Sequence, residues 1–212
     1  MTLSETAAGA IGGNGERLIL ASGSVTRRRL LDAAGVPFDV EPANVDEDEF
    51  KLGLRAEGAA GIEIAEVLAE AKAMYVSRKH AGRMVLGADQ ILECDGETLD
   101  KPVDRADAFG QLRMLSGRRH ELISYAVIVR DGRRIWQGVD RARLEMRETS
   151  DEFLEAYLDA VGNDVYNGPG GYRVEALGVQ LFRRIDGSHY TILGLPFLAL
   201  LDYLRDNGIL MS

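Results

Sequence analysis

The sequence predicts an α/β protein in which a mixed, twisted sheet forms two lobes around a deep cleft. Short apolar runs that are typical of strands alternate with helical patterns, but without the strict period of a doubly wound fold. Asp-Gly pairs at residues 95–96 and 131–132 fold neighbouring apolar runs into hairpins, which adds antiparallel strands. The chain has 212 residues, enough for one large domain or two closely joined lobes. We expect a single domain over residues 17–212, after a disordered tail at residues 1–16.

The charge and the cysteine content limit the partners and the compartment. The formal net charge is −9, which argues against a nucleic-acid polymer or an anionic membrane as the main partner. No apolar run approaches the length of a transmembrane helix, and the start of the chain lacks the pattern of a secretory signal. Cys94 is the only cysteine, so we expect no disulfide framework and a reducing, cytoplasmic location. A small polyanion stays compatible with this charge if cations are concentrated in one place.

The first strand, residues 17–21, leads through a small turn at residues 22–24 into a helix over residues 25–34. The first turns of this helix carry the cations Arg27 to Arg29, although the amino end of a helix is already partly positive. An anion held by the turn amides and one arginine would explain this placement. A basic face in contact with solvent is the alternative.

Two further segments contribute charged side chains. After a strand over residues 38–41, residues 46–49 are four consecutive acids, which form either a solvated loop or a source of oxygen ligands for a divalent cation. Residues 61–79 have the clearest amphipathic helical pattern in the chain. Lys72 lies at the edge of the apolar stripe of this helix and either extends to solvent or points into a cleft.

Residues 84–89 are predicted to form a buried strand that ends on the carboxylate of Asp89. The chain then turns back at residues 95–96 and returns to Lys101, so that an acid and a base reach the same rim. Open α/β sheets place their chemistry at the carboxyl ends of buried strands. The alternative is that Asp89 merely begins a turn, where aspartate is common.

The rest of the sequence predicts a helix, a long hairpin, a second helix, a glycine-rich loop, a strand and a last helix. In chain order they cover residues 104–117, 120–147, 149–158, 167–178, 180–185 and 194–207. Glycine-rich loops often line sites, and Glu175 is the only acid of this one.

The charged candidates together suggest chemistry on phosphate. Arginine and lysine suit phosphate oxygens, while Asp89 and Glu47 suit a divalent ion or an attacking water. No Walker motif, GxGxxG finger or activated nucleophile is evident. The residues alone therefore predict metal-assisted attack on a phosphate ester or anhydride.

Seven short motifs follow one another over residues 17–209. They are residues 18–24 with the arginines that follow, Val45-Asp46-Glu47, Ala71-Lys72-Ala73, Gly87-Ala88-Asp89-Gln90, Asp100-Lys101-Pro102, Leu115-Ser116-Gly117 and Gly194-Leu195-Pro196. In this order they resemble the motif set of the Maf family of nucleoside triphosphate pyrophosphatases. The resemblance implies a Maf/ITPase-like fold and cleavage of a nucleoside triphosphate to the monophosphate and diphosphate, helped by Mg²⁺ or Mn²⁺.

The resemblance also implies roles for individual residues. Asp89 would be the proton acceptor, and Glu47 would join Asp89 in holding the metal. The residues that would hold the triphosphate are Ser22, Arg27, Lys72 and Lys101. The implied partner is a small-molecule nucleoside triphosphate, and the implied role is the removal of modified or surplus nucleotides. A homodimer is compatible with the sequence.

Three positions depart from the commonest Maf pattern and resemble the subgroup that acts on 7-methyl-GTP. They are Thr26, Gln90 and Glu175, which we take as specificity positions. A carboxylate suits the N1 and N2 hydrogens of positively charged 7-methylguanine, whereas a neutral amide matches uracil better. The alternatives are a dTTP or UTP pyrophosphatase of the same family, an inosine or xanthosine triphosphate pyrophosphatase, and a nucleotide-binding regulator of septum formation.

Overall fold

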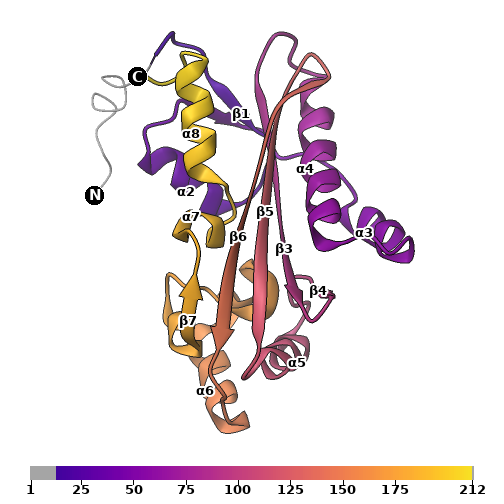
Figure 1. Ribbon diagram of the computed structural model, residues 1–212, viewed down its shortest axis with the longest axis vertical. Helices are drawn as coiled ribbons and strands as arrows, with labels where there is room; N and C mark the ends of the chain where they lie inside the picture. Colours follow the sequence, from indigo (N-terminus) through magenta and orange to yellow (C-terminus); the bar gives the residue numbers. More distant parts are fainter. Residues whose placement is uncertain (1–12, 212) are drawn as a thin grey trace. The chain divides into compact units, whose positions relative to one another are not determined.

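The computed structural model describes residues 13–211 (Figure 1). The strands are β1 Leu18–Leu20, β2 Phe38–Val40, β3 Val85–Cys94, β4 Glu97–Leu99, β5 Arg119–Arg130, β6 Arg133–Met146 and β7 Phe182–Asp186. The α-helices are α2 Val25–Ala33, α3 Glu47–Ala56, α4 Gly61–Ser77, α5 Arg105–Leu115, α6 Asp151–Val161, α7 His189–Ile192 and α8 Phe197–Asp206. The short 3-10 helices are η1 Gly162–Asn167, η2 Pro169–Gly171 and η3 Leu177–Leu181.

The strands form one mixed sheet, which confirms the predicted α/β class. Its strand order is β2-β1-β3-β5-β6-β7, and a seventh strand, β4, pairs with β3 off this path. β1 is parallel to both β2 and β3, whereas the pairs β3–β4 and β6–β7 are antiparallel. The hairpin predicted at residues 95–96 is therefore confirmed, and positive φ angles at both residues suit its tight turn.

The chain divides into two compact units. The first comprises the chain up to Gln90, the segment Ser124–Asp140 and the chain from Leu193. The second comprises Ile91–Ile123 and Arg141–Ile192, so β3, β5 and β6 each contribute residues to both units. The cleft that we expect between two lobes stays a prediction.

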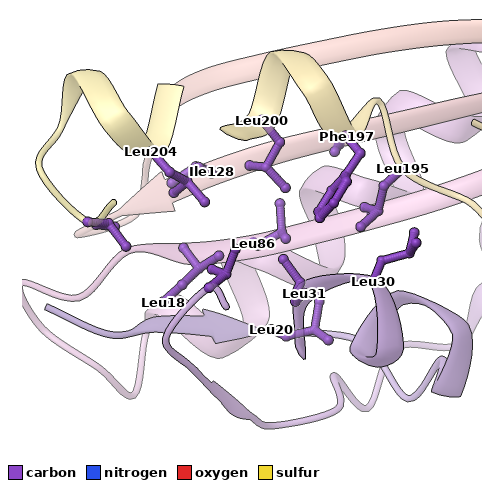
Figure 2. Close-up of a cluster of buried hydrophobic side chains, with 14 of the residues drawn as sticks. Leu18, Leu20, Leu30, Leu31, Leu86, Ile128, Leu195, Phe197, Leu200 and Leu204 are labelled. Atoms are coloured by element: carbon purple, nitrogen blue, oxygen red, sulfur yellow. The ribbon is translucent and has the colours of Figure 1, made fainter. Parts of the chain in front are cut away.

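The core of the first unit joins three strands to two helices. Figure 2 shows Leu18 of β1, Leu86 of β3 and Ile128 of β5 beside Leu31 of α2 and Leu200 of α8. All five side chains are fully buried, and each such burial contributes about 1.5–3 kcal/mol. This core fixes β1 against the parallel strand β3, so the residues that follow β1 lie at the same end as the later part of β3.

The second unit has a separate core around two helices and part of β6. α5 packs against α6, and buried leucines from both helices meet Leu144 of β6. The leucines are Leu112, Leu115, Leu154 and Leu158. The predicted helices over residues 104–117 and 149–158 are thus present as α5 and α6.

The acidic run at residues 46–49 is not a loop, so that interpretation is wrong. Asp46 is the N-cap of α3, and its side chain accepts a hydrogen bond from the backbone N–H of Glu49 at 3.1 Å. The other acids, Glu47 to Glu49, occupy the first turn of this helix. Negative charge is favourable there because the amino end of a helix carries partial positive charge.

The predicted tail, residues 1–16, lies mostly outside the described residues. Its last part makes backbone hydrogen bonds, from Gly13 N–H to the carbonyl of Ile209 and from Asn14 N–H to that of Gly208. Among the helices of residues 13–211, none has both the length and the apolar character needed to cross a bilayer.

Candidate active site

Asp89 lies within β3, not at its end, so both interpretations of this residue from sequence are wrong in detail. The strand continues to Cys94, and Asp89 is only 6 % exposed. Its Oδ1 accepts a hydrogen bond from Nζ of Lys72 at 2.7 Å. Its Oδ2 is buried and has no hydrogen-bond partner within residues 13–211. One oxygen of a buried carboxylate is therefore available for a bound group.

Lys72 reaches Asp89 because α4 lies unusually close to β3. A Cβ atom added to Gly87 would lie 2.1 Å from the carbonyl oxygen of Ala69 and 2.8 Å from Cβ of Ala73. Only glycine permits this approach of helix backbone to strand. The side chain of Lys72 is 8 % exposed, so of the two predicted alternatives it points inward and does not extend to solvent.

Glu47 provides a second carboxylate at the same ammonium group. It is the first residue of α3, and its Oε1 lies 2.9 Å from Nζ of Lys72. The Glu47 side chain is 42 % exposed, in contrast to the buried Asp89. Nζ of Lys72 thus bridges one exposed and one buried carboxylate, and the structure brings together three of the predicted site residues.

Arg27 makes its hydrogen bonds inside the protein. Its Nε donates to the carbonyl of Gly194 at 2.9 Å, and its Nη1 donates to Oγ of Ser22 at 3.1 Å and to the carbonyl of Ala88 at 2.9 Å. Burial lowers the pKa of Arg27, and the nearby carboxylate of Asp89 opposes this effect. Arg27 therefore links the turn after β1, the residue before Asp89 and the loop before α8.

The turn after β1 is organised by two serines. Oγ of Ser24 caps α2 by accepting from the N–H of Arg27 at 3.3 Å, and Oγ of Ser22 accepts from the N–H of Ser24 at 3.3 Å. Arg28 and Arg29 are exposed. The solvated basic face is thus the correct description for those two arginines, while Arg27 turns inward.

The predicted specificity residues are placed in both units. In the first unit, Thr26 is half-buried in the first turn of α2, and Nε2 of Gln90 donates to Oγ of Ser124 at 3.1 Å. In the second unit, Oε1 of Glu175 accepts from Nε of Arg173 at 3.0 Å. Lys101, also in the second unit, is exposed and follows β4. The roles of these residues toward a nucleotide stay predictions.

The carboxylates of the site fit a divalent cation only in part. Glu47 and Asp89 meet at one ammonium group, and Oδ2 of Asp89 lacks a partner. Across the described part of the chain, no group of three or more His, Cys, Asp or Glu side chains is arranged to hold a metal ion. Two carboxylates suit an ion such as Mg²⁺ when water and phosphate oxygens supply its other ligands.

Sequence reasoning missed the contacts that build this site. Gly87 belongs to one of the motifs, but the motif does not indicate the close approach of α4, which a glycine inside a buried strand can signal. The carbonyls of Ala88 and Gly194, which accept from Arg27, carry no signal that a sequence pattern could give. Backbone acceptors exist at every residue, so only the fold identifies the ones in use.

Fold and site define an α/β protein with a buried acid–lysine pair beside an internal arginine. The chain belongs to the Maf family, because the family model described as Maf-like protein matches residues 17–207. Two relatives are each named nucleoside triphosphate pyrophosphatase. The one from Paramagnetospirillum magneticum is 49% identical over 193 residues, covering 91% of this chain and 100% of that protein. The one from Nitrobacter winogradskyi is 50% identical over 197 residues, covering 92% and 96%.

A solved structure described as a nucleoside-triphosphatase, or dITP/XTP pyrophosphatase, from Mycobacterium abscessus is also similar. It is 15% identical to this chain, with a TM-score of 0.41, and the alignment covers 91% of this chain and 94% of that one. The family assignment rests on the sequence matches.

Proposed function

We propose that this chain is a nucleoside triphosphate pyrophosphatase, a hydrolase that releases the monophosphate and diphosphate. Two observations support the proposal: the names of relatives that share about half of its residues over nearly the whole chain, and the buried pair of Asp89 and Lys72. The observation that carries it is the buried Oδ2 of Asp89, which has no hydrogen-bond partner within residues 13–211. A buried acceptor of this kind is suited to hold a water or a metal ion.

In the proposed mechanism, Asp89 orients a water and accepts its proton as the water attacks a phosphorus atom. Lys72 is the cation that approaches the phosphate oxygens and stabilises the charge that develops on them. Arg27 positions Asp89 by holding the carbonyl of Ala88. Glu47 and Asp89 would hold Mg²⁺ or Mn²⁺, which supplies neutralisation of phosphate charge when bound.

For the substrate we propose 7-methyl-GTP, with Glu175 as the residue that reads the base. A carboxylate accepts hydrogen bonds from both N1 and N2 of 7-methylguanine. Its negative charge also complements the positive charge of this base, which a neutral acceptor does not. Glu175 is engaged by Arg173 in the structure, so this role requires Glu175 to exchange that contact for the base or to share it. A dTTP or UTP pyrophosphatase is the second candidate, because relatives are named only for nucleoside triphosphates in general.

A substrate panel tests both levels of the proposal. Pyrophosphate release is measured with 7-methyl-GTP, UTP, dTTP and ITP, for the native protein and for Glu175→Gln. We expect 7-methyl-GTP to have the highest kcat/KM, and Glu175→Gln to lower it by about tenfold or more relative to UTP. Equal losses on both substrates would remove Glu175 from base recognition. Binding of all four nucleotides without pyrophosphate release would contradict the hydrolase and favour a nucleotide-binding regulator.

A further inference from the structure

The ammonium group of Lys72 occupies the position that a cation shared by two carboxylates would take. Its Nζ lies 2.7 Å from Oδ1 of Asp89 and 2.9 Å from Oε1 of Glu47. These are the two carboxylates that we propose for the metal. Lys72 and a divalent ion therefore have the same partners available to them.

We propose that Lys72 is a resident cation that competes with the divalent metal for Glu47 and Asp89. In this proposal the metal binds tightly only when the phosphates of a nucleotide draw the ammonium group away. The inference rests on the proposed function, because it assigns an order to metal and nucleotide at the same site.

Charge balance supports the competition. The carboxylates of Glu47 and Asp89 face the cations Lys72 and Arg27, and Coulombic attraction links Arg27 to both acids. Two negative and two positive groups leave little net charge for a dication to neutralise. A bound triphosphate would add several negative charges at once, and this excess would favour a divalent ion.

The supply of ligands supports the same order. Within the described ranges, no third His, Cys, Asp or Glu joins the two carboxylates in a metal-binding group. Mg²⁺ prefers six oxygen ligands and commonly takes several of them from substrate phosphates. A nucleotide would therefore both remove the competing ammonium group and provide ligands that the protein lacks.

The movement required of Lys72 is small. The close contact of Gly87 with Ala69 and Ala73 fixes the backbone of α4 against β3. The ammonium group sits on a flexible stem of four carbons, so a rotation of the side chain can move it off the carboxylates while α4 keeps its place.

The test is the affinity of the nucleotide-free protein for Mn²⁺, measured by electron paramagnetic resonance of the free ion. Lys72→Met removes the charge and keeps the length of the side chain. We expect this variant to bind Mn²⁺ at least tenfold more tightly than the native protein. The matched control is Lys79→Met, in which the lost lysine pairs with Glu41 and has no contact with Glu47 or Asp89 among the described residues. This control is expected to keep the native affinity.

Native or weaker Mn²⁺ affinity in a folded Lys72→Met protein would overturn the inference. If that variant does not fold, the native protein is titrated with Mn²⁺ with and without a non-hydrolysable triphosphate analogue, and affinities within twofold of each other would overturn it. Pyrophosphate release by the native protein is measured separately. If the native protein releases pyrophosphate but Lys72→Met binds Mn²⁺ as the native protein does, only the competing role of Lys72 is rejected. If the native protein releases no pyrophosphate, the proposed function is rejected.

Discussion

The two carboxylate oxygens of Asp89 have different surroundings. Oδ1 is held by Nζ of Lys72 at 2.7 Å, while Oδ2 has no hydrogen-bond partner in the part of the chain that the structure describes. An unsatisfied buried acceptor costs on the order of 1–3 kcal/mol. A catalytic role or a bound water or ion is among the explanations for such an atom in a native protein. We therefore assign Oδ2 to the water or metal of the proposed reaction.

A second buried residue, His120, makes the free energy of unfolding depend on pH. Burial lowers the pKa of His120 from 6.5 to about 4, and its Nε2 lies 2.7 Å from the hydroxyl of Tyr172. The folded state therefore favours the neutral ring. The contribution of the neutral ring to stability is fully present above pH 6.5 and is lost as the pH falls toward 4. Between pH 7.5 and pH 5 this group alone should lower the free energy of unfolding by about 2 kcal/mol.

Urea unfolding of the native protein and of His120→Gln at these two pH values measures that contribution. The variant should be less stable at pH 7.5 but should lose about 2 kcal/mol less than the native protein on acidification. His189→Gln, which removes an exposed histidine, is the matched control. The same loss in all three proteins would show that His120 is not kept neutral by the fold.

At the scale of elements, the contact between α4 and β3 decides where Lys72 points. Gly87→Ala would place a methyl group 2.1 Å from the backbone oxygen of Ala69, so α4 must shift away from β3. We expect a loss of about 1–3 kcal/mol in the free energy of unfolding and a fall of about tenfold or more in pyrophosphate release, since Lys72 moves with the helix.

The control for this change is Gly110→Ala in α5, where an added Cβ meets no atom within 4 Å. Alanine is favoured over glycine inside a helix, so this variant should gain up to about 1 kcal/mol and keep its activity. Chemical denaturation and an assay of pyrophosphate release check both variants. Native stability and activity in Gly87→Ala would show that the contact does not set the position of Lys72.

Elements with strong periodicity could be predicted from the sequence, and those set by local capping could not. The expected helices at residues 25–34 and 61–79 appear as α2, Val25–Ala33, and α4, Gly61–Ser77. The sequence does not predict α3, because the acids of its first turn are equally typical of a solvated loop and the fold buries none of its residues. A run of acids is typical of a solvated loop, and only the hydrogen bond from Glu49 N–H to Asp46 identifies it as the start of a helix. The alternation of strands and hairpins was enough to predict the mixed sheet.

At the scale of the whole molecule, the predicted site residues divide between the two compact units. Ser22, Arg27, Glu47, Lys72 and Asp89 all belong to the first unit. Lys72 pairs with Glu47 and Asp89, while Arg27 bonds Ser22 and the carbonyl of Ala88, the residue before Asp89. Thr26 and Gln90 also belong to the first unit, whereas Lys101 and Glu175 belong to the second. The family motifs predict which residues form the candidate site, but side-chain partners such as those of Arg27 follow only from the packed fold.

The most direct test of the central claim compares Asp89→Asn with Asp95→Asn. Asparagine keeps an acceptor for Lys72 but cannot take a proton, so the first variant should fold normally and lose pyrophosphate release by about 10²–10⁴-fold. The control residue, Asp95, is an exposed turn residue with a φ angle of 51°, a conformation that asparagine also tolerates. The Asp95→Asn protein should therefore keep the native activity. Both proteins are compared by kcat under saturating nucleotide and metal, with circular dichroism to check folding. Retention of activity within a few-fold in a folded Asp89→Asn protein would contradict the account.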